Sequence, residues 1–258
     1  MSSVYAFAYY PLSFIELPTP KSTIWRYMSL SQFLAMLDTR TLHFSRADCL
    51  GDPLEGTITK PMVELRDFRT SRTLSDKEVR GFWRDQQFRN LKSVAISCWT
   101  MSKAESALMW SSYVKGHEGI AIKSTIGRLI AQFPKWRKRR SIPGKPADKE
   151  WMPIIIGDVR YLDYENETYP DAFNIIPLLH KHIVYKDERE LRALLWITSQ
   201  SLEEEGVSVP VDLSTLVDSI RVHPRSQPLL AEIVTKATRM HGFTFTVEQS
   251  QIVRRPMS

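Results

Sequence analysis

Two glutamates near the end of the segment DERELRALLW are the first candidates for chemistry. Glu188 and Glu190 are one residue apart, and side chains two positions apart in a strand point to the same face. Such carboxylates can accept a hydrogen bond, stabilise developing positive charge and take up a proton. Glu190 is nearer the apolar run, so it is the first candidate for the catalytic group, and Glu188 could position an acceptor. An equally weighted alternative is surface ion pairing with neighbouring basic residues, namely Lys186, Arg189 and Arg192.

Two arginines could bind an anionic group. Arg26 lies between Trp25 and Tyr27 in an otherwise apolar strand. Tyr27 is a further candidate binding residue. A guanidinium suits bidentate binding of a phosphate or a carboxylate. Arg46 is a second candidate, for a pyrophosphate. Structural ion pairs carry comparable weight, for Arg26 with a partner such as Glu105 and for Arg46 with Asp48.

The segment ESALMWSSY has helical spacing. Glu105, Met109 and Tyr113 fall on roughly one helical face, and Ser106, Trp110 and Tyr113 form a second stripe. A functional interpretation is an aromatic wall for a nicotinamide or adenine ring, with Ser106 and Glu105 at its polar edge. We favour the alternative that Trp110 and Tyr113 pack in the core.

A turn segment, GDPLEG, adds two carboxylates. Turn chemistry explains Asp52 but not Glu55, so Glu55 could reach a ribose or order an arginine. If these carboxylates meet Glu188 and Glu190, they could instead hold magnesium, as nuclease sites do.

Other motifs for metals and nucleophiles are poor. His180 and His182 alternate rather than sit at the spacing of a helical zinc pair, and neither a Cys-x-x-Cys motif nor a glycine-rich phosphate loop occurs. No metal is therefore expected. The two cysteines, Cys49 and Cys98, cannot form a disulfide framework, which favours a reducing, cytoplasmic setting. The proline-broken N-terminus supports neither a signal peptide nor a membrane span.

The charge permits a polyanionic partner. The net charge is +6 with a pI of about 9.3, and residues 135–149 carry seven basic residues. A solvated mobile loop at 135–150 is the favoured interpretation, with nucleic acid binding through it as the alternative. Trp136 within the run could stack on a base.

The organisation expected from these patterns is a single α+β domain over residues 1–258. An N-terminal segment, 1–23, is expected to lie against the body, and a helical insertion, 61–92, to pack over the sheet. The periodicity predicts strands at 23–29, 42–47, 93–102, 118–125, 151–164, 188–198, 207–213, 220–224 and 243–247. It predicts helices at 30–41, with Ser31 as N-cap, and at 104–116, 124–133, 171–183, 214–219 and 228–242.

Three blocks carry a family resemblance: LHFSRADCLGDPLEG, SCWTMSKAESALMWSSYVKGHEGIAI and HKHIVYKDERELRALL. Their motifs and order resemble the bacterial domain-of-unknown-function family 2971, over about residues 24–255. Within them, the Glu-Ser-x-x-Met-Trp-x-x-Tyr and Tyr-x-x-Glu-x-Glu-x-Arg patterns are specific. This resemblance implies no function.

A more distant resemblance implies one. A strand with a basic residue (Arg26), a helix (31–38), a second strand and a late glutamate (Glu188 or Glu190) is similar to the order in ADP-ribosyltransferases. The Ser-Thr-Ser element and the His-Gly-Thr triplet are missing. The resemblance implies a mixed or split sheet flanked by helices, NAD as substrate, and a glutamate that stabilises an oxocarbenium-like centre. It also implies a toxin or phage-defence effector acting on nucleic acid, with an antitoxin or regulatory partner.

The sequence therefore predicts an ADP-ribosyltransferase-like enzyme or NAD glycohydrolase. Its cleft is expected to hold a dinucleotide and to be lined by the ESALMWSSY helix together with Arg26, Arg46, Glu55 and Glu190. The alternatives are a magnesium nuclease and a non-catalytic module that binds a nucleotide or a partner.

Overall fold

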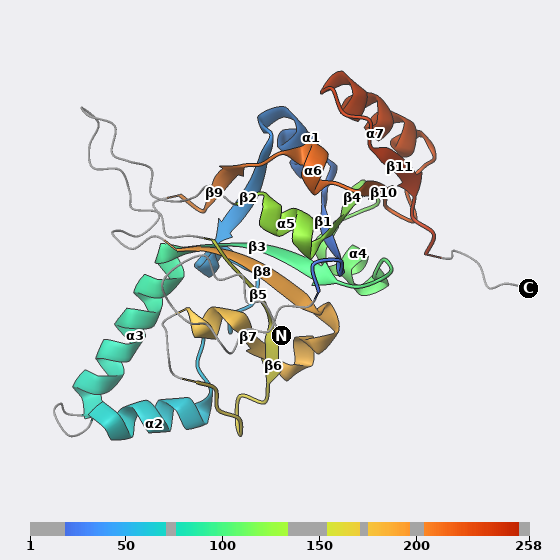
Figure 1. Ribbon diagram of the computed structural model, residues 1–258. Helices are drawn as coiled ribbons and strands as arrows, with labels where there is room; N and C mark the ends of the chain where they lie inside the picture. The colour runs from blue at the N-terminus through green and yellow to red at the C-terminus, as the bar shows by residue number, and fades with distance from the viewer. Residues whose placement is uncertain (1–18, 71–75, 134–153, 171–174, 197–203, 253–258) are drawn as a thin grey trace, which may run out of the picture.

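A mixed sheet of nine strands organises the part of the chain that the computed structural model describes, which is residues 19–70, 76–133, 154–170, 175–196 and 204–252 (Figure 1). Its strands are β1 (Thr23–Ser29), β2 (Thr41–Arg46), β3 (Val94–Met101), β4 (Gly119–Thr125), β5 (Ile155–Asp158), β8 (Glu190–Trp196), β9 (Gly206–Pro210), β10 (Ser219–Val222) and β11 (Thr246–Gln249). Two short strands, β6 (Arg160–Leu162) and β7 (His180–His182), form a separate parallel pair.

The helices flank this sheet. They are α1 (Leu30–Thr39), α2 (Lys60–Thr70), α3 (Asp76–Ser93), α4 (Ala107–Tyr113), α5 (Ile126–Ala131), α6 (Leu213–Leu216) and α7 (Leu229–Met240), with 3-10 turns η1 (Ala47–Cys49), η2 (Ile176–Leu179) and η3 (Ile183–Glu188). The predicted α+β class is confirmed. The N-cap of α1 is Ser29 and not Ser31, because Ser29 and Gln32 form a reciprocal capping box.

The insertion at 61–92 is helical, as predicted, but its position differs from the prediction. Figure 1 shows α2 and α3 projecting from one end of the sheet rather than covering it. The insertion joins the body near its ends, where Met62 of α2 is buried and Leu91 of α3 packs against the same cluster.

The sheet is split beside β3. One edge of β3 pairs with β8 from Val94 to Thr100. The other edge is shared, because β2 pairs with Ala95 and Ile96 whereas β1 pairs with Thr100 and Met101. Between these two contacts, β1 and β2 diverge. The predicted mixed or split sheet is therefore confirmed.

The two faces of the sheet pack against different hydrophobic clusters. Alternate residues such as Ile24, Trp99 and Leu191 enter the main core with α1, α5 and α7. The opposite face carries two smaller clusters, one around Leu194 and η2 and one around Trp25 and α4. This second face, on the α4 side, holds the candidate site.

Several predicted elements differ from the structure, and three of them bear on the region around the site. The strand predicted at 151–164 is two strands, β5 and β6, in separate sheets. In the helix predicted at 171–183, the described part is η2 followed by β7, because an apolar run of this length does not distinguish helix from strand. The strand predicted from Glu188 begins at Glu190, because Arg189 is left-handed with φ 46° and ψ 53°.

Two expected segments lie outside the described residues. They are most of the N-terminal segment 1–23 and the whole basic loop 135–150. Within the described ranges, no helix combines the length and the apolar character needed to cross a membrane.

Candidate active site

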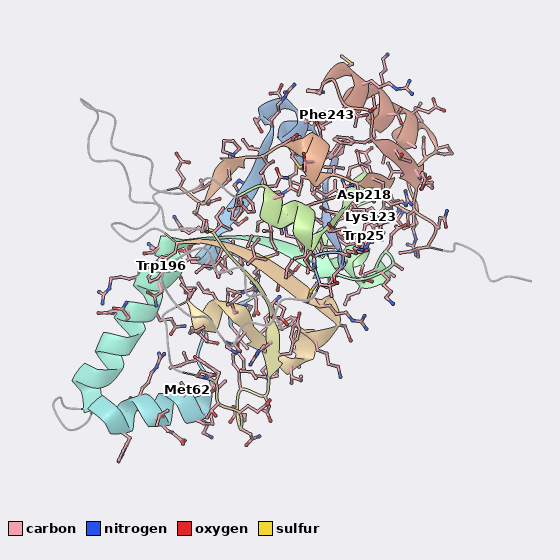
Figure 2. All side chains as sticks on the ribbon, viewed as in Figure 1. Trp25, Met62, Lys123, Trp196, Asp218 and Phe243 are labelled. Carbon is pink, nitrogen blue, oxygen red and sulfur yellow. The ribbon has the colours of Figure 1, made fainter. Side chains whose placement is uncertain are left out.

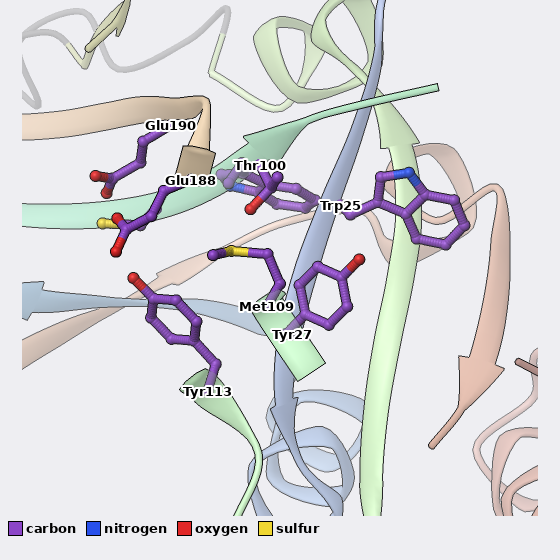
Figure 3. A pocket seen from close by; sticks show the side chains of 9 residues that line it. Trp25, Tyr27, Thr100, Met109, Tyr113, Glu188 and Glu190 are labelled. Carbon is purple, nitrogen blue, oxygen red and sulfur yellow. The ribbon is translucent and has the colours of Figure 1, made fainter. Parts of the chain in front are cut away.

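A pocket lies on the second face of the sheet, between β1, β3, β8, α4 and the end of η3 (Figure 3). It is partly open to solvent, and its cavity volume is about 30 Å³. Its lining residues are Trp25, Tyr27, Cys98, Trp99, Thr100, Met109, Tyr113, Glu188 and Glu190. This volume is far below the roughly 300–1,000 Å³ of typical ligand sites, so the pocket admits only an edge of a ligand and not a whole dinucleotide.

Strand register places the floor of this pocket. Trp25 of β1 is opposite Thr100 of β3, and Thr100 is opposite Glu190 of β8. Residues opposite one another in antiparallel strands share a face. Trp25, Thr100 and Glu190 therefore form one row across three strands.

Glu188 and Glu190 both face the pocket, but not for the predicted reason. Glu188 is the last residue of η3, and the left-handed Arg189 turns the chain before β8 begins. Two hydrogen bonds hold the Glu190 backbone directly after this turn. Its N–H donates to Tyr161 Oη (2.8 Å), and its carbonyl accepts from Val159 N–H (2.9 Å). A local turn thus brings the two carboxylates together.

Arg192 holds the Glu190 carboxylate from beneath the pocket. It donates from Nε to Glu190 Oε1 (3.1 Å) and from Nη2 to Glu190 Oε2 (3.0 Å). The same guanidinium makes two bonds with Glu55, from Nη1 to Oε1 (2.5 Å) and from Nη2 to Oε2 (2.9 Å). All three residues are buried. Pairing of Glu190 with Arg192 agrees with one predicted alternative, but the pair lies in the interior rather than at the surface.

Lys181 joins the two glutamates of the pocket. Its Nζ is 2.5 Å from Glu188 Oε2 and 3.5 Å from Glu190 Oε2, and its side chain is only 6% exposed. The result is a continuous network of ion pairs in the order Glu55, Arg192, Glu190, Lys181, Glu188, buried except at Glu188.

The network keeps Glu190 ionised. Burial opposes ionisation, but the charges of Arg192 and Lys181 outweigh it and lower the pKa of Glu190. Burial is also the largest influence on Glu55 and raises its pKa despite Arg192. For Lys181, burial acts in the opposite direction, yet Glu190 and Glu188 raise its pKa overall.

Cys98 contacts the same carboxylate from β3. Burial and the nearby Glu190 charge raise the thiol pKa well above its usual value. The thiol therefore stays protonated beside the Glu190 charge. Such a thiol is a weak nucleophile, so we assign it no nucleophilic role.

The remaining walls are aromatic or apolar, and two of them are fixed. Trp25 Nε1 donates to the Ser102 carbonyl (3.0 Å), and Tyr27 Oη accepts from Ser106 N–H (2.8 Å). Tyr113 is different, because 46% of its surface is exposed and its ring borders the pocket beside Glu188 (Figure 3). The alternative that Tyr113 is a core residue is therefore wrong.

The rest of the predicted aromatic stripe lies elsewhere. Trp110 is buried and packs edge-on against Tyr27, with ring centroids 5.0 Å apart, so its core assignment is confirmed. Ser106 is the N-cap of α4. Glu105 precedes the helix, accepts from Trp110 Nε1 (3.1 Å) and pairs with Arg221 (3.5 Å).

Arg26 does not enter the pocket. It follows Trp25 in β1, so its side chain points to the opposite face. There it lies in the split of the sheet, donating from Nη1 to Ser97 Oγ and from Nη2 to the His43 carbonyl of β2 (3.0 Å). A cleft shared by Arg26 and Glu190 was predicted and is wrong. A pairing of Arg26 with Glu105 is not found either.

Arg46 is also directed away from the pocket. It is opposite Ala95, a residue of the main core face, and its Nε donates to Asp48 Oδ1 (2.5 Å). The predicted alternative of pairing with Asp48 is thus confirmed. Of the residues expected to line one cleft, the structure brings Met109 and Tyr113 of α4 together with Glu190, and the candidate binding residue Tyr27 lines the same pocket. Glu55 lies behind Arg192.

Several residues of the site were missed. A lone arginine in the apolar run LRALL and a lysine between two histidines were the available signals for Arg192 and Lys181. The pocket residues missed are Trp25, Cys98, Trp99 and Thr100; Figure 2 labels Trp25 among all the side chains.

The carboxylates that meet are not arranged as metal ligands. Arg192 and Lys181 occupy the positions between Glu55, Glu190 and Glu188. No group of three or more histidine, cysteine, aspartate or glutamate side chains among the described residues is placed to hold a metal ion.

Comparisons with known proteins give little further information. No protein-family model matches the chain, so the predicted membership of family 2971 is not supported, and no curated protein matches it. Among solved structures, DarT from Thermus sp. 2.9 in complex with NAD+ matches 91% of this chain and 97% of its own, with 10% sequence identity and a TM-score of 0.39. At that TM-score, neither the ligand nor the residues of DarT can be transferred to this chain.

Proposed function

We propose that the chain cleaves the nicotinamide–ribose bond of NAD and transfers ADP-ribose to an acceptor or to water. The observation that carries this proposal is a buried, ionised Glu190 facing a small pocket with aromatic walls. Cleavage of an N-glycosidic bond builds positive charge on the ribose ring, and a fixed carboxylate stabilises such charge.

Three residues of the pocket have a role in this reaction. The bond between the ribose anomeric carbon and the ring nitrogen breaks, and its electron pair leaves with nicotinamide. Glu190 stabilises the ribose cation and accepts a hydrogen bond from a ribose hydroxyl. Glu188, whose side chain is 14% exposed, takes the proton of the attacking acceptor. Tyr113 stacks on the nicotinamide ring.

The phosphates of NAD would lie outside this pocket. Its lining contains two carboxylates and no arginine or lysine within the described residues. Arg26 and Arg46 lie on the other face of the sheet, so we assign them no role in binding NAD.

The acceptor is a separate part of the proposal. The basic segment 135–149 makes nucleic acid the first polymer to test, and a growth-arresting or phage-defence role would follow from modification of it. An antitoxin or regulatory partner would belong to the same role.

The experiment uses NAD labelled in the nicotinamide ring, with water, DNA or RNA as acceptor. We expect nicotinamide release by the wild type and a roughly 100- to 1,000-fold loss in Glu190→Gln, the size of effect that removal of one charge-stabilising group has in other enzymes. The matched control is Glu165→Gln, the same change at an exposed glutamate that pairs only with the exposed Lys60 in the described residues.

Two outcomes would contradict the proposal. If no acceptor supports nicotinamide release and NAD does not raise the melting temperature, the pocket is not an NAD site. If NAD raises the melting temperature without release, the chain is a non-catalytic nucleotide-binding module instead.

A further inference from the structure

The guanidinium of Arg192 uses every donor that it has. Its five N–H groups match five hydrogen bonds: two to Glu190, two to Glu55 and one from Nη1 to the Leu178 carbonyl (2.7 Å). Arg192 is 1% exposed. A planar group bonded at all five positions cannot rotate without breaking several bonds at once.

From this geometry we infer that Arg192, anchored by Glu55, is the positioning residue for Glu190 in the pocket. The inference rests on the proposed function and adds two residues that touch neither substrate nor reacting atoms. Arg192 sets the plane of the Glu190 carboxylate through its Nε and Nη2 bonds. Glu55 sets how much of the guanidinium charge Glu190 receives.

Two carboxylates compete for one cation. Glu55 and Glu190 contact adjacent edges of the same guanidinium and share its Nη2, and each carboxylate makes ionisation of the other less favourable. Removal of the Glu55 charge leaves Arg192 to Glu190 alone. Replacement of Arg192 by lysine keeps a cation but loses the planar fork that fixes the Glu190 carboxylate.

Other titratable or charged groups also face Glu190 and act in every variant alike. They are Lys181 on β7, Glu188 at the end of η3, Cys98 on β3, Tyr113 on α4 and Tyr161 on β6. Because these groups remain unchanged, a difference between variants at Arg192 and Glu55 reports on those two residues.

The test compares Arg192→Lys and Glu55→Gln with the wild type. In Arg192→Lys, we expect kcat for nicotinamide release to fall about 100-fold with KM within about twofold, the cost of a misplaced catalytic group. The acid limb of the plot of kcat against pH should move to higher pH, by about one unit. In Glu55→Gln, the acid limb should move in the opposite direction, to lower pH.

A measurement without substrate separates this inference from the proposed function. The protein is labelled at the glutamate carboxyl carbons, and the Glu190 signal is identified by its loss in Glu190→Gln. Its titration should shift upward in Arg192→Lys and downward in Glu55→Gln, even if the wild type releases no nicotinamide.

A purely structural role predicts something else. In that case both variants would lower the melting temperature and the fraction of active protein, while the Glu190 titration and the acid limb would stay at the wild-type pH. That result in the folded fraction of Glu55→Gln would overturn the inference, even if Arg192→Lys failed to fold.

Discussion

Arg26 and Glu190 lie on opposite faces of the sheet, although both of their strands pair with β3. Trp25, Thr100 and Glu190 form a row that faces the pocket. Arg26 is the residue after Trp25 in β1, so its side chain points to the other face. Arg26 instead bridges the split between β1 and β2 through Ser97 and the His43 carbonyl. Its contribution is therefore to the sheet, and that of Glu190 to the site.

Replacement of Arg26 tests the first half of this division. Arg26→Ala removes the donors to the Cys98 and His43 carbonyls, so the free energy of unfolding should fall by about 2 kcal/mol. Nicotinamide release per folded molecule should stay at the wild-type rate. Urea unfolding with a parallel activity assay measures both.

The control for Arg26 is Arg239→Ala, a change at an exposed position of α7, which should alter the free energy of unfolding by less than about 0.5 kcal/mol. Loss of NAD binding by folded Arg26→Ala, with the control unaffected, would return Arg26 to the site.

Tyr113 should contribute to binding rather than to folding. Stacking on an aromatic side chain is worth about 1–3 kcal/mol for a nucleobase, so Tyr113→Ala should raise the KM for NAD by roughly tenfold. Tyr113→Phe should retain the wild-type KM. Leu108→Ala is the control, because Leu108 is 44% exposed on the same helix and does not line the pocket. Equal KM values for Tyr113→Ala and Leu108→Ala would contradict the stacking role.

Stability should fall in mild acid because of His180. Burial lowers its pKa from 6.5 to about 4, and its Nδ1 donates to the Ile176 carbonyl (2.7 Å). Because the unfolded chain binds the proton more readily, this contribution is complete above pH 6.5 and is lost as the pH falls towards 4. The whole shift corresponds to about 3 kcal/mol.

The check on His180 is urea unfolding of wild type and His180→Asn at pH 7 and pH 5. The wild type should lose more of its unfolding free energy on acidification than the variant does. Parallel losses in the two proteins would show that other groups cause the acid sensitivity.

Chelation should leave the proposed activity intact. The carboxylates that meet in the interior are already paired with Arg192 and Lys181, so we expect equal nicotinamide release before and after dialysis against EDTA. Magnesium-dependent degradation of DNA or RNA that disappears in Glu55→Ala would instead favour the nuclease alternative.

Local patterns predicted much of the fold. Short apolar runs with polar ends predicted β1, β3 and β4 to within about one residue, because strands buried on both faces appear as nearly continuous apolar runs. The charged segment before β8 has no such run. Its turn depends on a left-handed Arg189, a conformation that sequence rarely indicates outside glycine and asparagine.

The site was less predictable than the fold. Glu188 and Glu190 were identified from their types, but the face that Arg26 occupies depends on how β1 and β2 share one edge of β3. The bond from Arg192 to Glu55 joins residues that are 137 positions apart. Neither relationship is visible without the pairing of distant segments, so the predicted arginine-lined cleft could not be distinguished from the acidic pocket that the structure has.

The most direct test of the central claim is nicotinamide release from labelled NAD by wild type, Glu190→Gln and Glu165→Gln, each shown to be folded by its melting curve. The account predicts release by the wild type and Glu165→Gln, and a loss of roughly 100-fold or more in Glu190→Gln. Equal release by all three proteins would contradict it.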